Sequence, residues 1–186
     1  MSIMNPLSKE PVQRMNDESF TEFHQLNNQW CLWAHMPHNT DWSIQSYINV
    51  ATFSTVEDTV AITETLPDIL VKNCMLFVMK KNIMPMWEDP QNRNGGYFSY
   101  KVPNKMVYEV WKKLTYALVG ETVCLEYGHF KLVSGISISP KKDFCIIKIW
   151  ISSPTHQNPK MIISDIKGIS SQGCLFTLFK SQSTFN

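Results

Sequence analysis

This chain has few arginines and glycines, and its cysteines show no paired spacing. Its 186 residues include seven glycines and five cysteines, and no two cysteines have C-x-x-C spacing. An odd number of unpaired cysteines argues against a disulfide framework and therefore against a secreted protein. The first residues contain no apolar signal core, and nowhere do 18 apolar residues follow one another. We therefore expect a soluble protein with reduced thiols, located in the cytoplasm.

Charge is also low. Charged residues make up 18% of the chain, the net charge is +1, and the only arginines are Arg14 and Arg93. No overall electrostatic field draws such a molecule to nucleic acid or to acidic membranes, so any anion site must be local. The 44% of hydrophobic residues is enough for one ordinary core. We predict a flexible N-terminal arm over residues 1–22 and one domain over residues 23–186.

The common signatures of enzymes are missing. The sequence has no phosphate-binding loop, no dinucleotide fingerprint, no H-E-x-x-H and no G-x-S-x-G. His35, His38 and Asp41 are near one another in sequence, but Pro37 prevents a helical ligand face, and a solvated loop is the simpler interpretation. We predict no catalytic residue, no metal and no cofactor, and hence a protein that is not an enzyme.

Hydrophobic periodicity indicates more strands than helices. Helices are predicted from a cap at Ser54 or Thr55 to Thr65, over 105–119 with Asn104 as cap, and over 160–166. Links between neighbouring strands are short, so the fold class is α+β, an antiparallel sheet with two or three helices on one face. Strands are predicted over residues 30–34, 47–53, 74–79, 97–102, 133–139, 144–151 and 175–179.

Tryptophan is abundant, with six residues in the chain. Trp30, Trp33 and Trp111 lie within a predicted strand or on the apolar face of a predicted helix, which is typical of a core. Trp42 instead ends a polar loop, and Trp87 lies between two prolines and is followed directly by two carboxylates. An exposed ring next to an acid is what recognition of a flat base requires, because the ring stacks on the base and the acid accepts hydrogen bonds from its edge.

Several motifs occur in one order along the chain. They are H-Q-L-N-N-Q-W-C-L-W at 24–33, Trp42, T-V-E-D at 55–58, P-M-W-E-D at 85–89 followed by G-G at 95–96, then Trp111, G-E at 120–121 and Trp150. In this order and spacing the chain resembles the messenger-RNA cap-binding translation initiation factor 4E family, over roughly residues 23–150 with a weaker tail to 179. The fold of that family, a curved antiparallel sheet backed on its convex face by helices, agrees with the fold read from periodicity.

The resemblance implies binding of the 7-methylguanosine cap of messenger RNA in translation initiation. Trp42 and Trp87 would sandwich the cationic methylated base, Glu88 would accept protons from the guanine edge, and Trp150 would lie against the methyl group. Asp89 is expected to hold the loop through backbone donors rather than to contact the ligand.

The phosphate-binding residues depart from the family pattern. The family has an arginine after the paired glycines, where this chain has Tyr97, and a second arginine where this chain has Lys141. A family lysine corresponds to Ile146. Lys148 has the same strand parity as Trp150 and should face the same side. We therefore predict Lys141 and Lys148 as phosphate contacts, with Lys142 as a weaker candidate.

The surface that binds partners in the family is also altered. The resemblance places His24, Leu26, Val56, Val60 and Trp111 there, but Val60 replaces an aromatic residue. Lys112 and Lys113 follow Trp111 where the family has an apolar–acidic pair, and Gln25 replaces a proline. A lost aromatic anchor and a reversed charge weaken an interface. We expect the usual scaffold protein to bind poorly, or a different partner to bind instead.

Alternative functions remain open. The protein is either an initiation factor or a cap-binding repressor or competitor that does not engage the usual scaffold. An enzyme that acts on capped RNA is a third possibility, disfavoured because no clustered acidic metal site is visible. The fourth is a β-rich interaction domain whose tryptophans are all structural.

Overall fold

The computed structural model describes residues 22–163 and 165–179. The predicted N-terminal arm, residues 1–22, lies outside the described residues except for Glu22. The part of the chain that the structure describes contains no helix long and apolar enough to cross a membrane.

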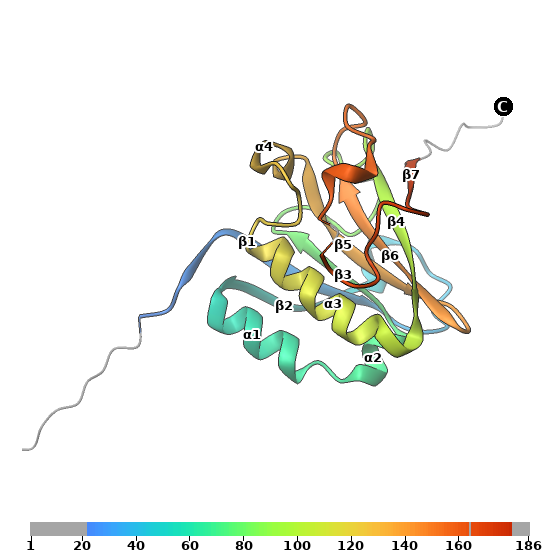
Figure 1. The fold of residues 1–186 in the computed structure, drawn as a ribbon. Helices are drawn as coiled ribbons and strands as arrows, with labels where there is room; N and C mark the ends of the chain where they lie inside the picture. The colour runs from blue at the N-terminus through green and yellow to red at the C-terminus, as the bar shows by residue number, and fades with distance from the viewer. Residues whose placement is uncertain (1–21, 164, 180–186) are drawn as a thin grey trace, which may run out of the picture.

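One antiparallel sheet of seven strands forms the centre of the fold (Figure 1). The strand order is β2-β1-β3-β5-β6-β4-β7, so the C-terminal strand pairs with β4 at one edge. The β5–β6 hairpin was predicted from the short link at residues 140–143, and its pairing confirms that prediction. The strands are β1 (Gln25–His35), β2 (Tyr47–Thr55), β3 (Met75–Lys80), β4 (Gly96–Pro103), β5 (Val133–Pro140), β6 (Phe144–Ile151) and β7 (Leu175–Leu178).

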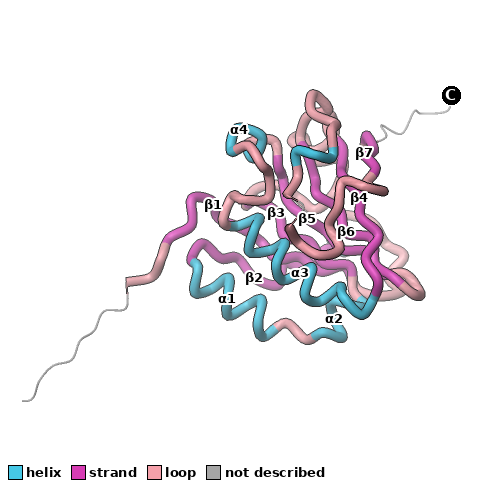
Figure 2. Tube along the Cα trace, viewed as in Figure 1, coloured by secondary structure: helices cyan, strands magenta, loops and turns pink. Residues whose placement is uncertain are grey.

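Three helices, α1 (Val56–Thr65), α2 (Asp68–Asn73) and α3 (Asn104–Val119), cover one face of this sheet (Figure 2). A fourth, α4 (Tyr127–Phe130), lies at one end, and two single turns of 3-10 helix span Ile44–Ser46 and Pro159–Met161. The predicted α+β class, with two or three helices on one face of a curved antiparallel sheet, is confirmed.

Strand alternation divides the apolar side chains between the two faces of the sheet. In β6, Cys145, Ile147 and Ile149 belong to the large core beneath the helices. Trp150 belongs to a smaller cluster on the opposite face, together with Phe77, Met79 and Ile83. Successive side chains of a strand point to opposite faces. The face without helices therefore carries its own aromatic floor, and this floor positions the site described below.

Helix α1 begins as the sequence predicts. Its cap is Thr55, whose hydroxyl oxygen accepts a hydrogen bond from the Asp58 amide at 3.0 Å. For α3 the predicted cap is wrong. Asn104 is already the first helical residue, and its side-chain amide donates to the Lys142 carbonyl at 3.2 Å instead of closing the helix. This bond ties the start of α3 to the β5–β6 turn.

The predicted helix over 160–166 is also wrong among the described residues. Only Pro159–Met161 forms a helical turn, with the Asn158 side chain accepting from the Lys160 amide at 3.0 Å. Beyond it, Ile162 pairs in an isolated bridge with Cys124, and the Ile163 amide donates to the Val123 carbonyl at 3.0 Å. These backbone bonds hold the segment extended, which competes with continuation of the helix.

Candidate functional site

A cavity of about 510 Å³ lies over the aromatic floor, on the face of the sheet that the helices leave uncovered. It brings together Trp42, Trp87, Glu88, Lys148 and Trp150, which come from three separate parts of the sequence. The strand parity predicted for Lys148 and Trp150 is thereby observed. The lining comprises Trp42, Tyr47, Met75, Phe77, Pro85, Met86, Trp87, Glu88, Tyr97, Lys148, Trp150, Thr177, Leu178 and Phe179.

Trp42 ends the loop that follows β1, and its side chain is 54% exposed. The loop is closed by short polar contacts: Asn39 Oδ1 accepts from the Asp41 amide at 2.9 Å, and Asp41 Oδ1 accepts from the Ser43 amide at 2.8 Å. The hydrogen bonds from Ser43 lower the pKa of the Asp41 carboxyl. These contacts fix the backbone on both sides of an indole that stays open to the cavity.

Trp87 projects from the second loop, which joins β3 to β4. Asp89 holds this loop, as predicted, because its carboxylate accepts from the amides of Met84 at 2.9 Å and Gln91 at 2.8 Å. The fully buried Asn92 adds two bonds, donating from Nδ2 to the carbonyls of Met84 at 3.1 Å and Met86 at 3.0 Å. Trp87 is thus half-buried on a loop that is bonded internally on both sides, and the adjacent Glu88 is exposed.

Trp150 forms part of the floor of the cavity and is only 6% exposed. Its Nε1 donates to Ser137 Oγ across the β5–β6 pair at 2.9 Å. Its ring makes an edge contact with Phe77, with centroids 6.3 Å apart, and a tilted contact with Phe179 at 4.8 Å. It therefore presents a fixed apolar surface from below rather than a free ring.

Cations lie in two places. The Lys148 ammonium lies 4.1 Å from the centroid of the Tyr97 ring, inside the cavity, and burial followed by the nearby Lys141 charge lowers its pKa. Lys141 and Lys142 do not line this cavity. They line a neighbouring one of about 600 Å³, which shares Trp42 and Met75 with the first. The three predicted lysines are thus divided between two cavities that have Trp42 and Met75 in common.

Four aromatic side chains of the site were not predicted: Tyr47, Phe77, Tyr97 and Phe179. Phe77 was detectable in principle, because it has the opposite strand parity to the buried residues Leu76 and Val78. Phe179 was not, since its place depends on the pairing of the last strand with β4, which no local pattern specifies.

A hollow of about 500 Å³ lies on the helical face, opposite the cavity between Trp42 and Trp87. Leu26, Val56 and Val60 line it, together with Glu64 and Tyr116. The structure thus brings together three of the five predicted partner residues. His24 lies close by and contacts Glu57, with Nδ1 2.7 Å from Oε1.

Trp111 was predicted to share this partner surface, and its position requires a correction. It is 2% exposed within the core, so its ring is not available to a partner.

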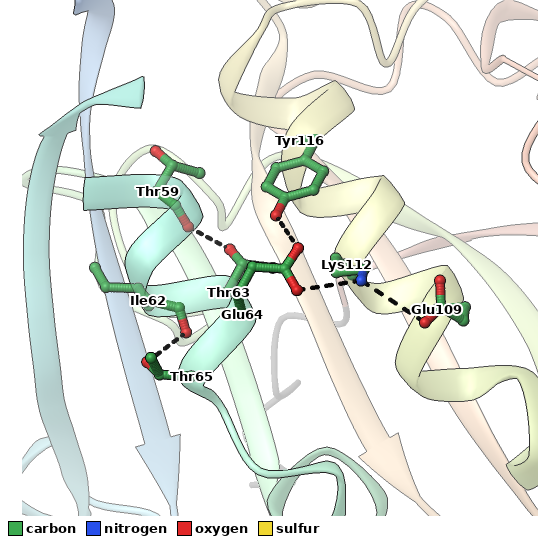
Figure 3. Close-up of polar contacts among 8 residues, drawn as sticks. All are labelled: Thr59, Ile62, Thr63, Glu64, Thr65, Glu109, Lys112 and Tyr116. Atoms are coloured by element: carbon green, nitrogen blue, oxygen red, sulfur yellow. Dashed lines mark hydrogen bonds and ion pairs between the residues drawn. The ribbon is translucent and has the colours of Figure 1, made fainter. Parts of the chain in front are cut away.

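The lysine that follows Trp111 is part of a contact between two helices (Figure 3). Lys112 Nζ lies 3.3 Å from Glu64 Oε2, and the Tyr116 hydroxyl donates to Glu64 Oε1 at 2.8 Å. Two side chains of α3 thus bind one carboxylate of α1. Lys112 also approaches Glu109 at 3.7 Å. The positive charge is therefore largely matched within the molecule at this point of the helical face.

Among the residues described, no group of three or more histidine, cysteine or acidic side chains is arranged to hold a metal ion. His35, one of the residues considered above, has another environment. Its Nε2 is 2.8 Å from the Asp41 carbonyl oxygen, and its ring stacks on Trp42 with centroids 4.2 Å apart and planes 4° from parallel.

Comparison with known proteins places this geometry in context. The model of a family described as eukaryotic initiation factor 4E matches residues 25–175. A eukaryotic translation initiation factor 4E homolog of Acanthamoeba polyphaga mimivirus is 28% identical over 160 residues, covering 75% of this chain and 59% of that protein. Eukaryotic translation initiation factor 4E-2 of Schizosaccharomyces pombe is 31% identical over 148 residues, covering 76% of this chain and 59% of that protein. The chain thus spans about 59% of the length of these two curated relatives.

Solved structures match as well. A Caenorhabditis elegans eIF4E-3, in a complex with the 4E-binding protein Mextli and a cap analog, has a TM-score of 0.64 and 26% identity, covering 72% of this chain and 77% of that one. A schistosome eIF4E complexed with m7GpppG and 4E-BP has a TM-score of 0.67 at 22% identity, covering 87% of this chain and 94% of that one, which supports the fold.

Proposed function

This chain belongs to the eukaryotic initiation factor 4E family, and from that premise we propose that it binds the 7-methylguanosine cap of messenger RNA in the cavity between Trp42 and Trp87. One observation carries the proposal. Two indoles from separate loops line a single cavity, and Glu88, the residue after one of them, lines the same cavity. The cap complexes among the matched structures support the same ligand class.

The methyl group at N7 gives the guanine ring a positive charge, and this is what two indoles recognise. Stacking of a base on an aromatic side chain contributes about 1–3 kcal/mol. A cation over an indole face adds about 0.5–2 kcal/mol more. Trp42 and Trp87 provide one face each, so the cation–π contribution is made twice. The unmethylated base carries no charge and lacks both contributions. Trp150 closes the floor, where the methyl group would lie.

Glu88 sets the identity of the base. Guanine presents two adjacent donors, N1–H and the N2 amino group, and a carboxylate accepts both as charge-assisted hydrogen bonds. Adenine has no such donor pair. Glu88 is exposed and lies next to Trp87, so its carboxylate can move to meet the edge of a base stacked on that ring.

The triphosphate follows the lysines from one cavity to the next. Lys148 lies closest to the base, and Lys141 with Lys142 receives the phosphates farther along. A lysine acts on phosphate as a point charge, without the paired bonds that arginine makes. Affinity should consequently fall steeply as salt rises.

On this proposal the domain over residues 23–186 acts in translation initiation in the cytoplasm, as a binding protein and not as an enzyme. The altered helical face favours one alternative, a cap-binding repressor or competitor. Val60 offers no aromatic anchor, and Lys112 already holds Glu64 across α1 and α3. Adding the protein to a cap-dependent translation extract separates the two roles: an initiation factor rescues a depleted extract, and a repressor inhibits a complete one.

Binding of the usual scaffold has its own test. A family-type scaffold peptide should bind this chain well below the affinity it shows for an ordinary family member. Replacing Val60 with tryptophan should strengthen the binding if the missing anchor is the cause. Submicromolar binding of the peptide to the unaltered chain would overturn this part of the proposal.

The cap proposal itself is tested by titration. A 7-methylguanosine nucleotide should quench tryptophan fluorescence. Its affinity should be at least about tenfold higher than that of the unmethylated nucleotide. Glu88→Ala should abolish most of the binding, while Glu126→Ala, which removes an exposed acid outside the cavity, should leave it unchanged. Equal responses to both nucleotides would reduce the site to a generic nucleotide binder.

A further inference from the structure

The cap proposal leaves His35 without a role, although this residue is in direct contact with the site. His35 ends β1 and is 2% exposed. Its ring lies flat against the Trp42 indole, with centroids 4.2 Å apart and an angle of 4° between the planes. A second ring, that of Tyr47, makes an edge contact with it at 5.3 Å. A buried polar ring is thus held from two sides against the exposed indole.

The position of the imidazole relative to the ligand follows from the two cavities. Trp42 lines both cavities, whereas His35 lines only the neighbouring one that also contains Lys141 and Lys142. The indole therefore separates the imidazole from the space facing Trp87. A base bound between the tryptophans would form the third layer of a stack, imidazole on indole on base.

The hydrogen bond of His35 determines which ring nitrogen carries the proton when the imidazole is neutral. Nε2 lies 2.8 Å from the Asp41 carbonyl oxygen, which can only accept, so Nε2 carries the proton and Nδ1 is the free acceptor. The ring is oriented by this bond and by Tyr47. Protonation at Nδ1 adds a full charge without breaking the contact, and the charge lies directly over the indole.

We propose that His35 is a positioning and specificity residue of the cap site: neutral, it fixes Trp42 and leaves the open face of the indole to a cationic base, and protonated, it weakens binding of that base. This inference rests on the proposed function. A cation on one face of an indole draws on the same electron density that a cation on the other face needs. The two like charges also repel each other across the ring.

Other groups facing His35 leave the charge change largely to His35 itself. The Asp41 carboxylate stays ionised and the Tyr47 hydroxyl stays neutral near neutral pH, because their pKa values are lowered by Ser43 and raised by burial, respectively. Histidine is the side chain that changes charge between about pH 5 and 8. Across the neighbouring cavity lie His38, Lys72, Lys141 and Lys142, among which His38 is the second histidine. His38→Gln is accordingly the matched control.

The test is a pH series of the same titration, from about pH 7.5 to about pH 5.5, with a 7-methylguanosine nucleotide at constant ionic strength. His35→Phe keeps a flat ring against Trp42 and removes the charge. Because phenylalanine cannot make the hydrogen bond to the Asp41 carbonyl, each variant is compared with its own affinity at the upper pH. On acidification the wild type should lose about three- to tenfold more affinity than His35→Phe. Phosphate groups of the nucleotide titrate equally in every variant, so the ratio between variants isolates His35.

Two further readouts separate this role from a purely structural one. The ratio of methylated to unmethylated affinity should fall on acidification in the wild type relative to the same ratio in His35→Phe, a comparison in which titration of the nucleotides themselves cancels. His38→Gln should follow the wild type. Parallel pH profiles for wild type and His35→Phe, or methylation ratios that change equally in the two, would overturn the inference and leave cap binding intact. Absence of binding at the upper pH would overturn the cap proposal and this inference with it.

Discussion

Trp42 shows how a single residue acquires its role from its immediate neighbours. The loop composition around it predicts exposure, and it is 54% exposed. What holds it there, a histidine at the end of the preceding strand and an Asp41–Ser43 turn, follows from three-dimensional contacts that no periodicity reports. The sequence predicts which ring is exposed and available to a ligand, and only the structure identifies its support.

Removal of either indole should reduce cap affinity. In the case of Trp42, removal should have little effect on the stability of the fold. Trp42→Ala is expected to weaken binding of a 7-methylguanosine nucleotide by about 10- to 1,000-fold, because a stacking term and a cation–π term are both lost. Isothermal titration calorimetry measures the affinity and thermal unfolding measures the stability. Tyr127→Ala, which removes another exposed aromatic ring outside the cavity, serves as control. Unchanged affinity in Trp42→Ala would contradict the sandwich.

Glu88→Gln tests base recognition without changing the size of the side chain. The amide accepts one proton from guanine but opposes the other with its own donor. Affinity for the methylated nucleotide should fall about 10- to 100-fold. Preference over a 7-methyladenosine nucleotide, measured by competition, should narrow at the same time. If selectivity stays the same while affinity falls, Glu88 contributes general electrostatics rather than edge recognition.

At the scale of elements, the loop that carries Trp87 depends on Asn92. Its side-chain amide is fully buried and bonds two carbonyls of the same loop. Asn92→Ala leaves both carbonyls without this donor, so we expect a loss of about 2–4 kcal/mol in the free energy of unfolding. Cap affinity should fall as well, because Trp87 loses its support. Chemical denaturation tests the first effect.

The neighbouring Gln91 is the control for that experiment, since its side chain is exposed and only its backbone amide bonds Asp89. Gln91→Ala should change neither quantity. If Asn92→Ala keeps both the free energy of unfolding and the cap affinity of the wild type, Asp89 holds the loop without help from Asn92.

The contact between α1 and α3 should depend on pH. The Tyr116 hydroxyl, and after it Lys112, lowers the pKa of the Glu64 carboxyl. A carboxyl with a lower pKa in the folded than in the unfolded chain stabilises the fold above its unfolded pKa of about 4.3, and this contribution is lost as pH falls through the folded value. Glu64→Gln should lower the melting temperature by about 1–3 °C at neutral pH.

The difference between wild type and Glu64→Gln should shrink toward zero below about pH 3, where both chains are neutral at this position. Glu109→Gln is the comparison, because Glu109 reaches only Lys112, at 3.7 Å; its effect should be smaller. An equal loss of melting temperature at neutral and acidic pH would assign the effect to packing instead of charge.

The elements also show where sequence patterns predict well. The long helix was predicted over 105–119, and its regularly spaced apolar residues at 107, 110, 111, 114 and 118 are all buried in α3. Helix α2 was not predicted, because the proline before it suggested only an end to α1, and its six residues are too few for a clear period. The failed helix after Pro159 reflects backbone pairing with a distant segment.

At the scale of the molecule, the sheet order explains what the sequence could not reveal about the site. Strands β3 and β5 are neighbours although 52 residues separate their ends, Lys80 and Val133. Loop composition predicted Trp42 and Trp87 with its adjacent acid, and strand parity placed Lys148 on the same face as Trp150, which the family resemblance had indicated. They could not predict that Lys141 and Lys142 occupy an adjoining cavity, because this depends on how the β5–β6 turn projects past Trp42.

The cavity between Trp42 and Trp87 lies on the face without helices, and the hollow lined by Leu26, Val56 and Val60 lies on the helical face, so the molecule has two separate surfaces. Cap and partner are expected to bind on opposite sides of one sheet, with the core between them. An altered partner surface is therefore expected to leave the cap site intact.

Cap binding is tested by a crystal structure of the protein with a bound 7-methylguanosine nucleotide. The base should lie parallel between the Trp42 and Trp87 rings, each about 3.5–4 Å away. The Glu88 carboxylate should lie within hydrogen-bonding distance of N1 and N2, and the phosphates should lie toward Lys148. A base bound elsewhere, or stacked on neither indole, would contradict it.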